Sequence, residues 1–79
     1  MSGQDADAPS INIRFGATVR RLRQQHRLSQ EVLADLAGIN RSYLGEVERG
    51  QVTPSLETIE KIARALGRPL AELIAASHG

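Results

Sequence analysis

Positive charge is concentrated in one stretch of this 79-residue chain. Five arginines and no acidic residue fall between positions 14 and 27: Arg14, Arg20, Arg21, Arg23 and Arg27. Guanidinium groups clustered in this way can neutralise phosphates, so the stretch is a candidate nucleic-acid contact. The net charge of the chain is only +1, and a solvated helix face explains the cluster equally well. The arginines alone leave both interpretations open.

The sequence lacks the patterns of catalytic and metal-binding sites. Its carboxylates are spread along the chain, and no serine, histidine and acid form a convincing nucleophilic group. There is no cysteine, and His26 and His78 are too far apart to form a metal-ligand pattern. No glycine-rich phosphate loop is present either. We therefore expect a protein that is not an enzyme and that uses no cofactor and no metal.

Length and composition fit one small globular domain. Hydrophobic residues make up 41% of the chain and charged residues 24%, which argues against disorder. No apolar run approaches the roughly 18 residues that a membrane span requires. The N-terminus contains acids and no basic stretch, so it does not have the pattern of a secretory signal. A soluble, cytoplasmic protein is the expectation.

The spacing of apolar residues predicts an all-α fold of five short helices, since no stretch alternates as a strand would. Residues 1–12 are small, polar and acidic and are expected to form a mobile tail. Residues 13–76 are expected to form the folded domain, and residues 77–79 to fray. The first helix should run from about Ile13 to Gln25, and the last should begin near Pro69.

Two adjacent helices between Ser29 and Arg49 form the centre of the predicted domain. Ser29 and Asn40 are favoured N-caps for them, and Ala37-Gly38-Ile39-Asn40 is a short glycine-containing turn. Two short helices joined in this way are typical of a helix-turn-helix. In the later helix of this pair, the third of the five, Leu44 and Val47 point inward. The other faces are left to four polar residues: Arg41, Ser42, Glu46 and Arg49. The N-terminal end of this helix is the end that enters the major groove of DNA. The fourth helix should be capped by the hydroxyl of either Thr53 or Ser55.

The run LSQEVLADLAGINRSYLGEVERGQVTPSLETIEKIARALG resembles the lambda-repressor/Cro/Xre class of helix-turn-helix DNA-binding domains. The resemblance covers residues 13 to about 75, and its landmarks are Arg23, Gln30, Leu33-Ala34, Gly38, Glu48-Arg49-Gly50, Pro54-Ser55 and Ala63-x-x-Leu66-Gly67. The short chain and the run NRSYLGEVERG also resemble the controller proteins of restriction-modification systems. The resemblance implies a compact five-helix lambda-repressor-like domain from a bacterium or phage, cytoplasmic and nucleoid-associated. It also implies a transcriptional regulator that binds double-stranded DNA at a palindromic operator as a homodimer.

The resemblance also implies which residues contact DNA. Arg41, Ser42 and Glu46 occupy its base-facing positions. An arginine can donate to O6 and N7 of guanine, a serine can donate or accept, and a glutamate can accept from N4 of cytosine. Alternatively, Glu46 could orient Arg41. The expected backbone contacts are Gln30, Tyr43, Arg49, Gln51, Thr53, Ser55 and Arg27. Tyr43 fits a half-buried core aromatic equally well. Arg27 stands where the family usually has glycine, so it either adopts a left-handed conformation or the turn differs.

Arg23 and Glu48 lie on the inward edges of their helices, four residues after Val19 and Leu44. An unpaired buried charge is very costly, so two opposite charges in such positions require each other. The family has a salt bridge at these two positions, joining the first and third helices. We therefore expect a structural ion pair between Arg23 and Glu48.

A dimer needs an apolar surface beyond the core of one chain. Near the fourth and fifth helices the candidates are Leu66, Leu70, Leu73 and Ile74, which could equally close the core of the monomer. Val32 and Leu36 form another apolar pair. They suit an alternative function, that of a DNA-binding antitoxin that also binds a toxin partner. A third possibility is a helical protein-interaction module without DNA binding, for which the low net charge is the only support.

Overall fold

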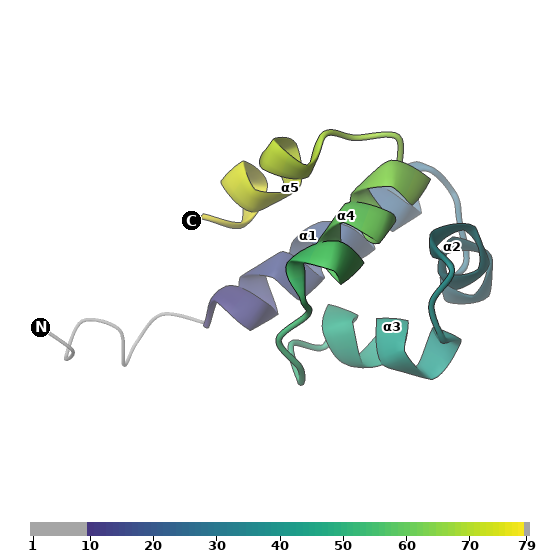
Figure 1. Ribbon diagram of the computed structural model, residues 1–79, viewed down its shortest axis with the longest axis horizontal. Coiled ribbons are helices and arrows are strands. Elements are labelled where there is room, and N and C mark those ends of the chain that lie inside the picture. Colours follow the sequence, from purple (N-terminus) through teal and green to yellow (C-terminus); the bar gives the residue numbers. More distant parts are fainter. Residues whose placement is uncertain (1–9, 79) are drawn as a thin grey trace, which may run out of the picture.

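The structure, a computed structural model, describes residues 10–78 (Figure 1). This part of the chain contains five helices joined by short turns or loops. In chain order they are α1 (Ile11–Gln25), α2 (Gln30–Ala37), α3 (Arg41–Glu48), α4 (Leu56–Ala65) and α5 (Leu70–Ser77). Helices α2 and α3 lie together at one end of the molecule, and α5 lies toward the other. The predicted all-α fold with its helix-turn-helix at the second and third helices is confirmed.

Four of the five helices begin with a side-chain cap. Ser29 accepts a hydrogen bond from the N–H of Val32, and Asn40 accepts from two amides at the start of α3. Both N-caps were expected from the sequence. Of the two candidates before α4, Ser55 is the cap, since its hydroxyl accepts from the N–H of Thr58. These bonds satisfy amides that have no partner inside their helices, and so they fix where each helix starts.

Helices α1 to α4 all end in the same type of turn. After α1, the N–H of Leu28 donates to the carbonyl of Arg23 at 3.1 Å, across a residue with positive φ. The same bonding pattern follows the next three helices, where the positive-φ residues are Gly38, Gly50 and Gly67. In the first turn that residue is Arg27, with φ 57°. Of the two possibilities predicted for Arg27, the left-handed conformation is the one observed. A side chain in this region costs energy that glycine avoids.

The core is built mainly from one face of each helix. Helix α1 packs against α3 and α5, while α2 packs against α3 and α4. Gly16 permits the close approach of α1 to α3, because a Cβ there would lie 2.2 Å from the carbonyl oxygen of Val47. The largest side chains that are almost fully buried include Leu33, Leu44, Ile62, Leu73 and Val19.

Two residues predicted for a dimer interface belong to this core instead. Leu66 is 2% exposed and Leu73 is 0% exposed, so neither can contact a second chain. They turn inward because α5 folds back on α1 and α4. Leu70 is half-buried and Ile74 is exposed, so these two remain candidates.

The folded region is longer at both ends than the sequence suggested. Helix α1 begins at Ile11 rather than near Ile13, and Asn12 donates to Thr53 Oγ1 at 2.7 Å. Helix α5 includes Ser77, which is 1% exposed, and Arg14 Nε donates to its carbonyl at 2.9 Å. Ser77 therefore packs rather than frays. Residues 1–9 of the expected tail lie outside the described residues. None of the described helices has the length and apolar character needed to cross a membrane.

Candidate nucleic-acid interface

Helices α2 and α3 are joined by a tight turn that sets their relative orientation. Gly38 has φ 71°, and the N–H of Ile39 donates to the carbonyl of Ala34 at 3.0 Å. Helix α3 then starts at Arg41, with its first amides bound by the side chain of Asn40. The buried residues Leu44 and Val47 anchor its inner face. The turn and this anchoring hold the opposite face of α3 toward solvent.

The residues predicted to read bases lie on the solvent side of α3 or at its edge. Arg41 and Ser42 occupy the first two positions of the helix and are exposed. Glu46, further along the helix, is half-buried as a residue. The start of α3 therefore presents a guanidinium and a hydroxyl, groups that can hydrogen-bond to base edges.

The predicted ion pair between Arg23 and Glu48 is present and bidentate. Arg23 Nε lies 2.7 Å from Glu48 Oε2, and Arg23 Nη2 lies 3.1 Å from Oε1. Their side chains are 12% and 3% exposed. Arg23 Nη1 also donates to the carbonyl of Leu28 at 2.8 Å, in the turn that precedes α2. One arginine on α1 thus ties together the end of α3 and the entry to α2.

Gln30 has a role that the sequence did not reveal. Its Nε2 donates to Glu48 Oε1 at 3.0 Å, which links the first residue of α2 to the last residue of α3. The prediction for Gln30 was a contact with the DNA backbone. In the structure its amide nitrogen is engaged within the protein, and the side chain is half-buried. A buried carboxylate oxygen can accept more than one hydrogen bond, but no pattern in the sequence indicates that Gln30 adds a donor to the one that Arg23 supplies.

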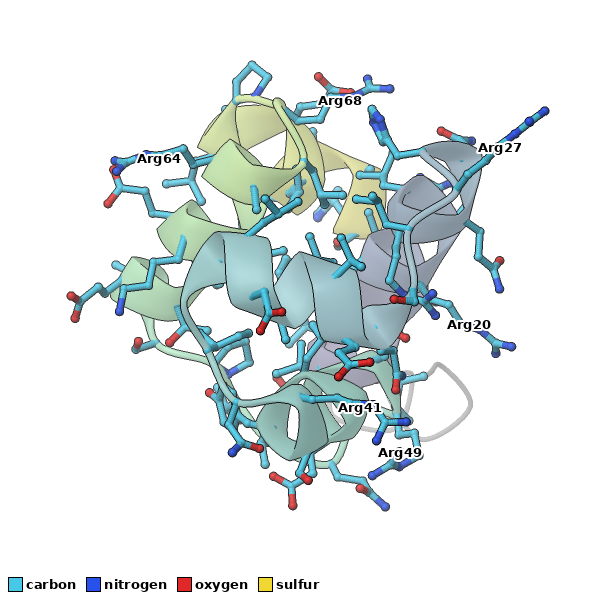
Figure 2. The ribbon with its side chains drawn as sticks, turned by 90° about the vertical axis from the view of Figure 1, so that its right-hand side faces the viewer. Arg20, Arg27, Arg41, Arg49, Arg64 and Arg68 are labelled. Atoms are coloured by element: carbon cyan, nitrogen blue, oxygen red, sulfur yellow. The ribbon has the colours of Figure 1, made fainter. Side chains whose placement is uncertain are left out.

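Several arginines gather on one side of the molecule. Figure 2 shows Arg20 and Arg27 of the α1 region on the same side as Arg41 of α3 and Arg49, the C-cap of α3. Arg64 and Arg68 point elsewhere. The arginines from separate parts of the chain thus form one basic surface, which includes the outer side of α3. A surface of this kind attracts phosphates and raises association rates with DNA.

The remaining predicted backbone contacts differ in how free they are. Gln51 and Thr53 are exposed in the loop before α4, although Thr53 Oγ1 already accepts from Asn12. Ser55 is occupied as the cap of α4. Tyr43 is half-buried and packs against the core, and both interpretations of it fit that position.

Two restriction-modification control proteins are similar to this chain. The crystal structure of the restriction-modification controller protein C.AhdI from Aeromonas hydrophila is 51% identical, covers 77% of this chain and 92% of its own, and has a TM-score of 0.76. The control protein C.BamHI of Bacillus amyloliquefaciens is 42% identical over 59 residues, which is 73% of each chain.

A phage protein is similar over a smaller share of its length. The immunity repressor protein of Bacillus phage phi105 is 37% identical over 59 residues, or 75% of this chain. The present chain spans only 41% of that repressor. The family model for a helix-turn-helix matches residues 19–73. That match takes in α2, α3 and α4 entirely, and on this basis the chain belongs to the helix-turn-helix family.

Proposed function

We propose that the chain is a sequence-specific transcriptional regulator that binds a palindromic operator in double-stranded DNA as a homodimer. The observation that carries the proposal is the exposed N-terminal end of α3, formed by Arg41 and Ser42, with Arg41 on the same side of the molecule as Arg20 and Arg27. A helix presented in this way enters the major groove, where its first residues contact base edges. The similarity to controller proteins favours a regulator of that type.

Arg41 and Ser42 would supply the sequence-reading contacts. An arginine bound to O6 and N7 of guanine discriminates by about 1–3 kcal/mol against the wrong base. Glu46 would act chiefly by orienting a neighbouring side chain or by rejecting unfavourable sequences, since a carboxylate near phosphates is repelled unless it meets a donor.

The part of the basic surface outside α3 would hold the phosphates beside the groove. Arg20 on α1 and Arg27 in the turn after it are exposed there. Gln30 begins α2, and the N-terminal end of a helix favours an anion. Such contacts fix the register of the protein on DNA and carry most of the salt dependence.

An apolar surface near α5 would form the homodimer. Ile74 is 44% exposed and lines a hollow of ≈ 160 Å³ together with Ile11, Phe15, Pro54 and Ile59. Leu56, at the start of α4, is 74% exposed. Two copies that buried these side chains against each other would present two α3 helices to successive major grooves. Because one module of this size contacts few base pairs, the second copy doubles the sequence that is read.

One observation favours a second candidate function. Val32 is 44% exposed and Leu36 is 60% exposed on α2, and Leu36 borders a hollow with Lys61 and Arg64. An exposed apolar pair of this kind suits a protein partner, as in an antitoxin that also binds DNA. Copurification of a second chain would favour this function over an autonomous regulator.

Selection of bound duplexes from a random DNA library tests the proposed function. We expect enrichment of an inverted repeat whose half-site centres lie about 10 base pairs, or a multiple of that, apart. Titration of the selected duplex at several salt concentrations should give log K falling by about 0.9 for each phosphate neutralised. If no sequence is enriched even at low salt, the proposal is wrong and a protein partner becomes the leading explanation.

A further inference from the structure

Arg49 does not extend away from the end of α3 but lies back along it, over Gly45. Gly45 is buried, and a Cβ placed there would lie 3.1 Å from Arg49 Nη1 and 3.7 Å from Nη2. The guanidinium therefore covers the bare backbone of Gly45. A side chain at position 45 would occupy part of this space, so the missing side chain provides the room for the guanidinium.

Arg41 and Arg49 share one side of α3. Positions 41, 45 and 49 are separated by four residues each, which places them in one row along a helix. Figure 2 shows both arginine side chains on the same side of α3. Because Arg49 reaches back to Gly45, its guanidinium acts at the middle of α3 rather than at its C-terminal end.

Gln51 orients this guanidinium. Arg49 Nε donates to Gln51 Oε1 at 3.1 Å. With Nε engaged, the two terminal amines are left to form a fork, the arrangement that binds O6 and N7 of guanine. Arg49 is exposed and has no carboxylate partner among residues 10–78, so its charge is not neutralised within that region.

We propose that Arg49 is a second base-reading residue that recognises a guanine in the major groove, and that Gln51 is its positioning residue. The proposal rests on the proposed function, since it requires α3 to enter the groove. It replaces the sequence-based prediction of a backbone contact, because phosphates flank the groove whereas this guanidinium lies over the middle of α3. Gly45 is four residues beyond Arg41, or about 6 Å along the helix. At 3.4 Å per base pair, the two guanines should be roughly two steps apart.

The test compares the DNA preferences of wild type, Arg49→Ala, Arg49→Lys and Arg64→Ala. Each is subjected to library selection, and its affinities are measured on the selected duplex, on single-base-pair variants and on random DNA. We expect Arg49→Ala to lose about 5- to 150-fold on the selected duplex and to become indifferent at one base pair per half-site. Arg49→Lys should restore only part of the preference, because an ammonium group can donate to guanine but lacks the planar fork. Arg64→Ala removes the same charge from a side chain that is 79% exposed on another side, and it should leave the preferred bases unchanged.

Gln51→Ala removes the orienting group without changing the charge of the protein. We expect a partial loss of the same preference, with affinity for random DNA unchanged. The proposal is overturned if Arg49→Ala weakens selected and random DNA by the same factor and lowers the salt slope by about one, because that result identifies a phosphate contact. Failure of the proposed function is distinguishable from this outcome, since the wild type would then select no sequence at all.

Discussion

The two ends of α3 carry charged residues with different surroundings, which form two groups that do not include Glu46. At the inner edge, the carboxylate of Glu48 is 3% exposed and is held by Arg23 and Gln30. On the outer side, Arg41 and Arg49 are exposed and have no carboxylate within ion-pair distance among the described residues. Arg41 and Glu48 are the first and last residues of one eight-residue helix, and Arg49 is its C-cap.

The difference separates charges that hold the fold from charges that are available to a ligand. A buried charge without its partner is strongly unfavourable, so the Glu48 group should control stability. Truncating an exposed arginine changes the stability of the free protein very little. Arg41 and Arg49 should therefore control DNA binding rather than stability. If this division is correct, substitutions in the Glu48 group should change the free energy of unfolding, and substitutions of Arg41 and Arg49 should change DNA affinity.

The largest effect should come from Arg23→Met, which leaves Glu48 buried without its ion-pair partner. We expect the free energy of unfolding to fall by about 3–5 kcal/mol. Urea or guanidinium denaturation followed by circular dichroism measures this loss. The matched control is Arg20→Met, an exposed position on the same helix, which should change stability by less than about 0.5 kcal/mol.

A loss of this size could unfold so small a domain, so a second variant is needed. Arg23→Met combined with Glu48→Leu replaces both charges by apolar groups and should recover much of the lost stability, because no buried charge is left alone. Equal stability of Arg23→Met and Arg20→Met would show that Glu48 is solvated in solution, and the division of α3 into two groups would then fail.

The next effect should come from Arg41→Ala, on the outer side of α3. We expect a loss of about 1–3 kcal/mol in binding to the selected operator, together with a relaxed preference at one base pair per half-site. The denaturation midpoint of Arg41→Ala should equal that of Arg64→Ala, which removes an exposed arginine from α4 and serves as the control. Competition titrations with operator variants and random DNA measure both effects. A stability loss as large as that of Arg23→Met would place Arg41 in the structural group.

Much of the fold could be predicted from the sequence because local patterns determine it. The caps Ser29 and Asn40 each precede an apolar repeat, and both bind the amides that their positions predict. The pairing of Arg23 with Glu48 followed from two charges on inward edges and from the family resemblance, and the bidentate contact agrees. Signals of this kind are short in sequence and refer to the faces of single helices.

The parts that could not be predicted depend on distances between helices. An apolar stripe does not indicate whether its own chain or a partner covers it, so the sequence leaves both possibilities open for Leu66 and Leu73, which are buried in the core. The contact of Gln30 with Glu48 joins residues 18 positions apart, and no pattern in either helix specifies it. The placement of Arg49 over Gly45 depends on a side-chain conformation, which residue spacing alone does not determine.

The smallest effect should come from the turn after α1, where one substitution should change both stability and DNA binding. Arg27 has φ 57°, whereas the matching residue after α2 is Gly38 with φ 71°. Replacing Arg27 by glycine should relieve strain and raise the free energy of unfolding by about 1 kcal/mol. It should also remove one phosphate contact, which would weaken all DNA sequences alike and lower the salt slope by about one.

Gly38→Ala is the reciprocal variant, because a Cβ at that position would meet no atom within 4 Å. Its expected loss of about 1 kcal/mol therefore measures the left-handed conformation alone. Thermal melting of both variants, with salt-dependent DNA titrations of Arg27→Gly, tests the pair. Opposite shifts in stability, together with weaker binding by the more stable protein, would show that Arg27 carries strain at a position where its charge serves binding. A gain in stability with unchanged DNA affinity would remove Arg27 from the interface and leave its strain without a role in binding.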